Sequence, residues 1–244
     1  MTRSPLLRSP LFGLALLGLL GTGVAGCGGS GGDSDGTPAP RVRAVNLSPA
    51  AALDFTLNGD SASRDVAYLQ EDLPTIARND GTYDFGIRAS DSSVDLVSEG
   101  YTLQTGADYV YAAVGLVNPG DTPSQRLRGL LVGYDRRTPG ESRTRVIAIN
   151  AVLPETGTEP SPVVFQAPGD SPQFTFGSVA FGSSATQVLD AGPQTIEVRP
   201  DGATGTLATA TVSLLPGRTY IATYSGVTAG TGTSAPAVRF LLVP

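Results

Sequence analysis

The chain has no histidine, no tryptophan and no lysine, and it has one cysteine in 244 residues. The absence of histidine excludes Ser-His-Asp and Cys-His catalysis, and it removes the imidazole ligand of many metal sites. The absence of lysine excludes a Schiff base and the phosphate-binding lysine of Walker-type loops. A single cysteine allows neither an internal disulfide nor a cysteine-based zinc site. We therefore predict a protein that is not an enzyme and that holds no metal and no cofactor.

Basic residues are also scarce, since 16 arginines face 22 acidic residues and the formal net charge is −6. Removal of residues 1–26, which contain Arg3 and Arg8 but no acid, changes this charge to −8. A negative surface repels the phosphates of nucleic acids and the head groups of anionic lipids. We therefore predict that nucleic acid is not a partner.

The N-terminal region contains an apolar run of ten residues, LFGLALLGLL, at residues 11–20. A helix needs about 20 apolar residues to span a bilayer, so this run is too short to do so. Two arginines precede it and small residues follow it, which are the proportions of a secretory signal sequence. We therefore interpret residues 1–26 as a signal peptide.

The residues at the end of this segment, VAGC, resemble the bacterial lipobox, in which small residues precede a cysteine that is lipidated. The resemblance implies a diacylglyceryl group on the thiol of Cys27, cleavage before Cys27 and acylation of the new amine, for example by palmitate. An ordinary signal peptide followed by an unrelated cysteine is the alternative. The motif consists of Val24, Ala25, Gly26 and Cys27.

The residue after the predicted lipidated cysteine is Gly28, whereas an aspartate there retains enterobacterial lipoproteins in the inner membrane. The resemblance therefore implies a location in the cell envelope at the outer membrane, facing the periplasm or the cell surface. Residues 27–40 contain no large apolar side chain, so we expect a disordered tether. Two or three acyl chains would make the membrane anchor effectively permanent.

Beyond residue 40 the chain alternates apolar and polar residues in short segments that end at glycine or proline, as strands do. Residues 53–57 (LDFTL) show this alternation, and residues 109–114 (YVYAAV) are apolar on both faces, as in a central strand. No stretch keeps a helical period for three turns without glycine or proline. We therefore predict an all-β chain with almost no helix.

The folded region repeats itself. Residues 102–112 align with residues 213–223 at an offset of 111, and residues 41–46 align with residues 145–150 at an offset of 104. Such a repeat indicates two copies of one structural unit. The two predicted copies and their linker are residues 41–137, residues 144–244 and residues 138–143.

Each copy has about 100 residues and short strands, which suits an immunoglobulin-like, Greek-key β-sandwich. We expect seven strands in each copy. In the first copy they are expected near residues 41–47, 53–58, 65–70, 82–89, 94–104, 108–116 and 127–134. In the second copy they are expected near residues 144–151, 162–166, 173–181, 194–199, 206–215, 218–226 and 237–243.

A Leu-x-x-Gly-x-x-Tyr segment occurs in both copies and ends at Tyr109 and Tyr220. It resembles the tyrosine corner of immunoglobulin-like and fibronectin type III domains, in which the tyrosine hydroxyl bonds to upstream backbone. A plain hairpin with a tyrosine in one strand is the alternative. We predict structural tyrosine corners at both positions.

The opening of the first copy, RVRAVNLSP followed by LDFTLNG, resembles the bacterial domain of unknown function DUF4397. The later segments GTYDFGIR, at residues 81–88, and residues 103–110 match motifs of that family in the same order. The resemblance covers most of residues 41–116 and, more weakly, residues 144–226. It departs at Asn46 and Asn150, where the family often has histidine. The family is uncharacterised, so the resemblance implies fold and location but no ligand.

Several polar and aromatic groups are candidates for chemistry, and each has a structural alternative that we favour. Carboxylate clusters are more typical of solvated loops than of a glycosidase pair, although the 91–95 loop with Asp80 could hold calcium. We expect Asp54 at the surface or in a turn bond, and Asn46 and Asn150 in side chain–backbone bonds. The carboxylates are Glu71, Asp72, Asp91, Asp95, Glu155 and Glu159.

Two further groups could form binding surfaces. Exposed tyrosines could form a carbohydrate-binding face, but core packing is the favoured interpretation. Arginines near the junction of the copies could pair with acids across it or bind an anion. The tyrosines are Tyr83, Tyr101, Tyr109 and Tyr111, and the arginines are Arg126, Arg128, Arg136, Arg137, Arg143 and Arg145.

These patterns favour a lipid-anchored envelope protein that binds or scaffolds an envelope protein or a glycan without catalysis. A carboxylate-dependent glycan hydrolase is the alternative, and it requires a cleft with two carboxylates about 5–9.5 Å apart. A structural spacer without a specific ligand is a third hypothesis. Failure to capture any partner would favour the spacer.

Overall fold

The computed structural model describes residues 38–49, 52–70, 75–77, 79–118, 120, 122–155 and 158–244. The predicted signal peptide, the lipobox from Val24 to Cys27, and the pair Glu71 and Asp72 lie outside the described residues. Within these ranges no helix is long and apolar enough to cross a membrane. The described chain is all-β, as predicted, with four four-stranded sheets in two halves.

The first half contains two sheets with the strand orders β4-β1-β7-β8 and β3-β2-β5-β6. A short 3-10 helix, η1 (Pro123–Gln125), precedes its last strand. The strands are β1 (Arg41–Asn46), β2 (Leu53–Leu57), β3 (Asp60–Val66), β4 (Thr75–Ala77), β5 (Gly81–Ala89), β6 (Val97–Leu103), β7 (Ala107–Val114) and β8 (Arg128–Asp135).

The second half repeats both orders as β12-β9-β15-β16 and β11-β10-β13-β14, with η2 (Gly232–Ser234) in the place of η1. The halves therefore share one topology, as the sequence repeat predicts. The strands are β9 (Arg143–Leu153), β10 (Val163–Gln166), β11 (Thr175–Val179), β12 (Ser184–Asp190), β13 (Gly192–Pro200), β14 (Ala208–Leu214), β15 (Thr219–Val227) and β16 (Ala237–Val243).

Among the described residues each half has eight strands, so the prediction of seven was wrong. The strands β4 and β12 were missed, and β3 covers Asp60–Val66 in place of the strand expected at residues 65–70. All three are edge strands. They carry mostly polar or partly exposed side chains, such as the DSASRDV of β3, and therefore lack the alternating signal of a half-buried strand.

The strand order also differs from the predicted immunoglobulin-like order, in which the first strand pairs with the second. Here β1 pairs with β4 in antiparallel and with β7 in parallel, so that Val42 lies opposite Tyr109. The physical reason is that β2 belongs to the opposite sheet, where it pairs with β3 and β5. The same parallel pairing joins β9 to β15 in the second half.

In each half the facing sides of the two sheets enclose a hydrophobic core, which is the arrangement of a β-sandwich. In the first half Phe55, Phe85 and Tyr111 meet there, with ring centroids of Phe85 and Tyr111 5.0 Å apart. In the second half Phe165 and Ile196 are fully buried in the corresponding core.

A third hydrophobic core lies between the halves. On β9, Val146 belongs to the core of the second half while the next residue, Ile147, belongs to the third core. On β7 of the first half, Tyr111 belongs to the core of the first half and the next residue, Ala112, belongs to the third core. Because side chains alternate along a strand, these strands are apolar on both faces. The sheets that contain β7 and β9 therefore pack against each other.

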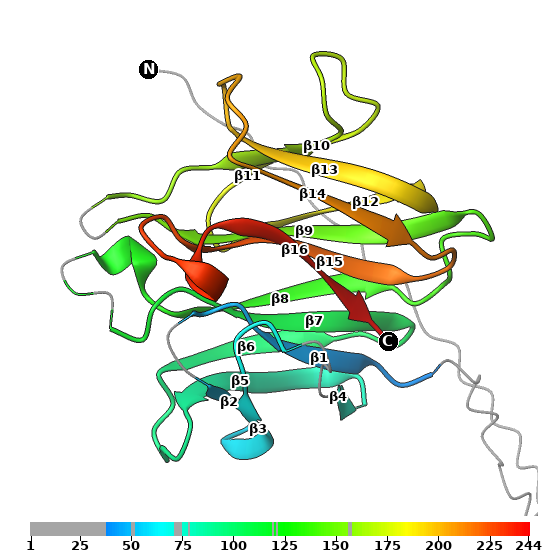
Figure 1. The fold of residues 1–244 in the computed structure, drawn as a ribbon. Helices are drawn as coiled ribbons and strands as arrows, with labels where there is room; N and C mark the ends of the chain where they lie inside the picture. The colour runs from blue at the N-terminus through cyan, green and yellow to red at the C-terminus, as the bar shows by residue number, and fades with distance from the viewer. Residues whose placement is uncertain are drawn as a thin grey trace, which may run out of the picture. The chain divides into compact units, whose positions relative to one another are not determined.

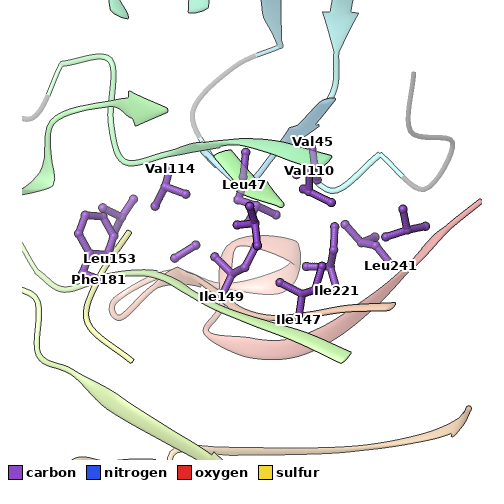
Figure 2. Close-up of a cluster of buried hydrophobic side chains, with 14 residues drawn as sticks. Val45, Leu47, Val110, Val114, Ile147, Ile149, Leu153, Phe181, Ile221 and Leu241 are labelled. Atoms are coloured by element: carbon purple, nitrogen blue, oxygen red, sulfur yellow. The ribbon is translucent and has the colours of Figure 1, made fainter. Parts of the chain in front are cut away.

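Figure 2 shows the third core, with Val45 and Val110 of the first half facing Ile147, Ile149 and Ile221 of the second half. Figure 1 shows the result as stacked layers, with the sheets of β2 and β10 on the outside and the sheets of β1 and β9 between them. The described residues form one compact unit.

The folded body begins before the expected boundary at residue 41. Residues 38–40, assigned to the disordered tether from the sequence, are described, and Pro40 is buried. The Ala39 carbonyl accepts a hydrogen bond from the Arg136 guanidinium. The end of the expected tether is thus part of the folded body.

Candidate functional site

The two tyrosines of the repeated Leu-x-x-Gly-x-x-Tyr segment occupy equivalent positions on β7 and β15. The Tyr109 hydroxyl accepts a hydrogen bond from the backbone N–H of Gln104 at 2.9 Å, and the Tyr220 hydroxyl accepts one from Leu215 at 3.3 Å. Both side chains are buried. The bond to upstream backbone is the contact that a tyrosine corner makes, and it assigns these residues a structural role.

Asn46 and Asn150 hold equivalent backbone bonds in the two halves, which confirms the prediction. The Asn46 amide donates to the carbonyl of Val66 at 2.9 Å and accepts from the N–H of Ser48 at 2.9 Å. The Asn150 amide donates to the carbonyl of Val179 at 3.1 Å. Both side chains are fully buried, so their amides satisfy backbone groups and are not open to a ligand.

Asp108 is the buried centre of a partly exposed charge cluster that the sequence did not indicate. Its carboxylate accepts from Arg41 Nη2 at 2.7 Å and from Arg136 Nε at 2.9 Å. Burial raises the pKa of this carboxyl, but the two guanidinium groups outweigh that effect and hold it below its usual value of 3.8. The cluster joins β1, β7 and the end of β8.

This depressed pKa makes the stabilisation by Asp108 dependent on pH. A carboxyl with a lowered folded-state pKa stabilises the protein above pH about 4 and loses that contribution as the pH falls through its folded-state value. We expect Asp108→Asn to lower the free energy of unfolding at pH 7 by about 2 kcal/mol. The difference from wild type should shrink towards pH 2 in urea melts. The exposed Asp201→Asn is the control, and an equal deficit of Asp108→Asn at both pH values would contradict this role.

The acidic 91–95 loop is tied to the first half by Asp95. Its carboxylate accepts from Arg88 Nε at 2.8 Å and from the Thr56 hydroxyl at 3.3 Å. Gly86 makes room for this contact, since a Cβ there would lie 2.9 Å from the Asp95 carboxyl group and 2.2 Å from the Thr56 hydroxyl. Across the described ranges, no three side chains of His, Cys, Asp or Glu are grouped to hold a metal ion.

The second half satisfies the equivalent arginine in a different way. Arg199 pairs with Glu197, which comes from the strand itself and also accepts from the Gln166 amide at 3.4 Å. Glu197 stands at the position of Gly86, since both precede by two residues the arginine of their strand. The carboxylate that pairs with the arginine therefore comes from a loop in the first half (Asp95) and from the strand itself in the second half (Glu197). This indicates a structural role for both carboxylates.

Asp54 lies at a small pocket of about 220 Å³ on the first half, together with Asp65, Asp91, Arg64 and Arg88. The prediction of surface placement was wrong for Asp54, because its side chain is buried. Its carboxylate accepts from the backbone N–H of Asp65 at 2.8 Å. Asp65 lies in β3, so this bond joins the two paired strands at the irregular register between Leu53 and Phe55, and it does not belong to the Asn58–Gly59 turn.

The tyrosines considered for a carbohydrate-binding face pack instead against the first core. Tyr109 and Tyr111 are buried. Tyr101 is half-buried, and its ring lies edge-on to Phe85 with centroids 5.8 Å apart. The favoured interpretation as core residues is therefore confirmed for these three.

Two of the arginines near the junction, Arg128 and Arg145, contact aromatic rings across the halves. Arg136 and Arg143 pair with acids of their own half, Asp108 and Asp190, and not across the junction as we expected. The guanidinium of Arg128 lies 4.9 Å from the ring centre of Phe181, and that of Arg145 lies 5.7 Å from the ring centre of Tyr134. Such contacts stabilise a cation without a carboxylate. Gln125, also at the junction, donates to the carbonyl of Thr158 at 3.0 Å. Together they reinforce the third core.

The cavity with the clearest binding chemistry is in the second half, at the edges of β11 and β12. It has a volume of about 440 Å³, within the range of small-molecule sites. No sequence pattern indicates it, because its residues come from four separate segments. Its lining includes Arg143, Phe174, Gln187, Val188, Asp190 and Gln194.

An ion pair lines this cavity. Arg143 Nη1 lies 2.9 Å from the carboxylate of Asp190, and Arg143 Nη2 donates to the carbonyl of Val188 at 2.9 Å. Gln194 donates to the carbonyl of Asp190 at 3.1 Å, and Gln187 donates to the carbonyl of Thr175. The cavity therefore presents side chains that are already fixed in position.

Comparison with known proteins identifies one family. Residues 40–157 match the family model of the Domain of unknown function (DUF4397). The chain therefore contains a DUF4397 domain, which covers the first half and extends to β9, beyond the resemblance expected over residues 41–116. No curated protein matches the chain.

Solved structures show distant similarity. The Bacillus anthracis TIE protein is 10% identical with a TM-score of 0.23, and the alignment covers 84% of this chain but only 34% of that protein. A "putative cell adhesion protein" from Bacteroides ovatus is 8% identical with a TM-score of 0.24, covering 85% of this chain and 96% of that one. Another from Bacteroides uniformis is 12% identical with a TM-score of 0.22, covering 86% and 97%. TM-scores this low carry no inference about fold or function.

Proposed function

We propose that the chain is a lipid-anchored protein of the bacterial cell envelope that binds or scaffolds another envelope component without catalysing a reaction. The observation that carries this proposal is that three buried carboxylates are bound by groups of the protein itself. Asp54, Asp108 and Glu197 are each buried and each held by protein donors. A general acid or base needs a free carboxyl that faces its substrate, and these three are committed to the fold.

We further propose that the second half is a diverged copy of the DUF4397 domain. The same strand order supports this, as do the equivalent bonds of Asn150 and Tyr220 in the second half. A pair of related domains on one anchor would present two related surfaces to the envelope. The proposed partner is an envelope protein or a glycan.

A carboxylate-dependent glycan hydrolase is the second candidate, because Asp54, Asp65 and Asp91 line one pocket. A general acid or base needs a free carboxyl that faces its substrate. In this pocket the Asp54 carboxylate is held by the backbone N–H of Asp65, and Arg88 is paired with Asp95. We therefore expect the purified protein to release no reducing ends from envelope glycans, and release that is lost in Asp91→Asn would favour the hydrolase.

Membrane attachment is tested by Cys27→Ala. We expect wild type to take up labelled palmitate and to sediment with membranes, and we expect the variant to lose the label and become soluble, because the acyl chains supply the anchor. Ser30→Ala in the same segment is the control and should stay membrane-bound. Wild type that is unlabelled and found in the soluble fraction would show that the lipoprotein proposal is wrong.

Binding is tested by crosslinking and capture from intact envelopes with wild type in its native location. We expect a specific envelope component to be recovered with wild type and at much lower yield with the soluble Cys27→Ala form. Recovery of no component from intact cells would support the structural spacer instead.

A further inference from the structure

At the cavity beside β11 and β12, side chains of the protein already bind several backbone carbonyls. Edge strands normally leave carbonyl and N–H groups open to a strand from a partner. Here side chains occupy the carbonyls of Val188, Asp190 and Thr175, with donors from Arg143, Gln194 and Gln187 respectively. A peptide that pairs by strand addition would have to displace these donors. An added strand at these positions would therefore replace three hydrogen bonds that are already formed.

The amides of Gln187 and Gln194 keep hydrogen-bonding capacity, and Gln173 and Thr175 add further polar side chains to the lining of the cavity. A glutamine amide has two N–H donors and one oxygen acceptor. Gln187 and Gln194 each use one N–H on a backbone carbonyl, so each retains an oxygen and an N–H in a fixed position. A hydroxyl group both donates and accepts, and it is therefore the ligand group that matches an amide best.

The charge of the cavity is balanced. Arg143 and Asp190 form an ion pair 2.9 Å long, and they are the charged residues that line it. A charged ligand would meet an opposite charge that is already neutralised and would gain little from entering. The cavity thus favours an uncharged ligand.

The same cavity carries an apolar surface beside the amides. Phe174 is half-buried, and its ring is held perpendicular to that of Phe176 with centroids 6.1 Å apart. Val188 next to it leaves 39% of its side chain exposed. A fixed aromatic ring beside polar groups suits a ligand with one C–H face and a hydroxyl rim. A sugar ring has both.

We propose that this cavity binds an uncharged, hydroxyl-rich saccharide, packed on Phe174 and hydrogen-bonded by Gln187 and Gln194. The proposal rests on the proposed function and specifies its ligand class as glycan. It assigns saccharide recognition to the second half alone. The strand beside the cavity, β12, pairs with β9 over seven residues, whereas its counterpart in the first half, β4, pairs with β1 over only three, so the two edges differ.

The test is saturation-transfer NMR on the purified full chain with maltotetraose, cellotetraose and chitotetraose at about 1 mM, which detects weak binding. We expect at least one of them to bind wild type. Phe174→Ala should weaken that binding about tenfold, the size of one lost ring contact. Gln194→Ala should weaken it similarly. Leu207→Ala, at an exposed position of the second half outside the cavity, is the matched control and should bind as wild type does.

Three results would overturn the proposal: no tetrasaccharide binds wild type, binding is unchanged in both cavity variants, or pentalysine binds the cavity in preference to the saccharides. If Phe174→Ala fails to fold by circular dichroism, Gln194→Ala decides alone. Capture of an envelope protein together with absent saccharide binding would leave the proposed function in place and refute the saccharide site. Absence of both would refute both.

Discussion

Replacement of Ile147 by aspartate is expected to unfold both halves of the protein together. Ile147 is fully buried in the third core, on a strand of the second half that faces the first. Loss of a buried isoleucine costs about 2–5 kcal/mol when it is truncated to alanine. An unpaired buried carboxylate adds several kcal/mol. The sum of at least about 5 kcal/mol is comparable with the whole stability of a domain.

The absence of tryptophan makes this result measurable half by half. Tyr101→Trp places a single fluorescent reporter in the first half, and Phe174→Trp places one in the second. In urea we expect the two reporters to show one coincident transition in the Ile147 wild-type background. Both reporters should be shifted together by Ile147→Asp. Leu207→Asp adds the same charge at an exposed site and should change stability by no more than about 0.5 kcal/mol. Two separate transitions, with only the second half shifted, would show that the third core does not couple the halves.

The second large effect is expected at Tyr220. Its ring is buried in the core of the second half, so Tyr220→Ala should lower the free energy of unfolding by about 3–5 kcal/mol. Tyr220→Phe keeps the ring and removes only the hydroxyl bond to Leu215, so its cost should be about 1 kcal/mol.

Tyr109 provides the matched comparison. Its hydroxyl bond is 2.9 Å long, against 3.3 Å for Tyr220, so Tyr109→Phe should cost somewhat more than Tyr220→Phe. Urea melts of Tyr220→Ala, Tyr220→Phe and Tyr109→Phe beside wild type measure all of these differences. A Tyr220→Ala variant as stable as wild type would contradict the role of the tyrosine in the corner.

The sequence was most informative where apolar residues repeat. The central strands, such as β7 with YVYAAV, were predicted because side chains apolar on both faces occur in strands covered on both sides. The offset of 111 between Tyr109 and Tyr220 predicted the repeated topology. The apolar faces of these strands do not indicate what covers them. That the sheet of β7 packs against the sheet of β9 is seen only in the structure.

Other features left no sequence signal. The edge strands β4 and β12 could not be predicted, because β4 has three residues and the side chains of β12 are mostly polar and partly exposed, without a clear period. The cavity beside β12 depends on Arg143 and Gln194, which are 51 residues apart. Asp108 likewise meets Arg41 because β1 pairs in parallel with β7, and it meets Arg136 because β8 pairs with β7 in antiparallel. Such contacts follow from topology, and topology was the part of the prediction that was wrong.

The third core also limits how such domains can be assembled. Each half has one sheet with an apolar outer face, which is covered by its counterpart, and one sheet whose outer face bears polar groups such as Arg88 and Arg199. Packing therefore stops at two: no third unit can stack on a polar outer face in the same way. Chains built from this unit should be stable with even numbers of copies, whereas an odd copy would need a separate partner to cover its apolar sheet.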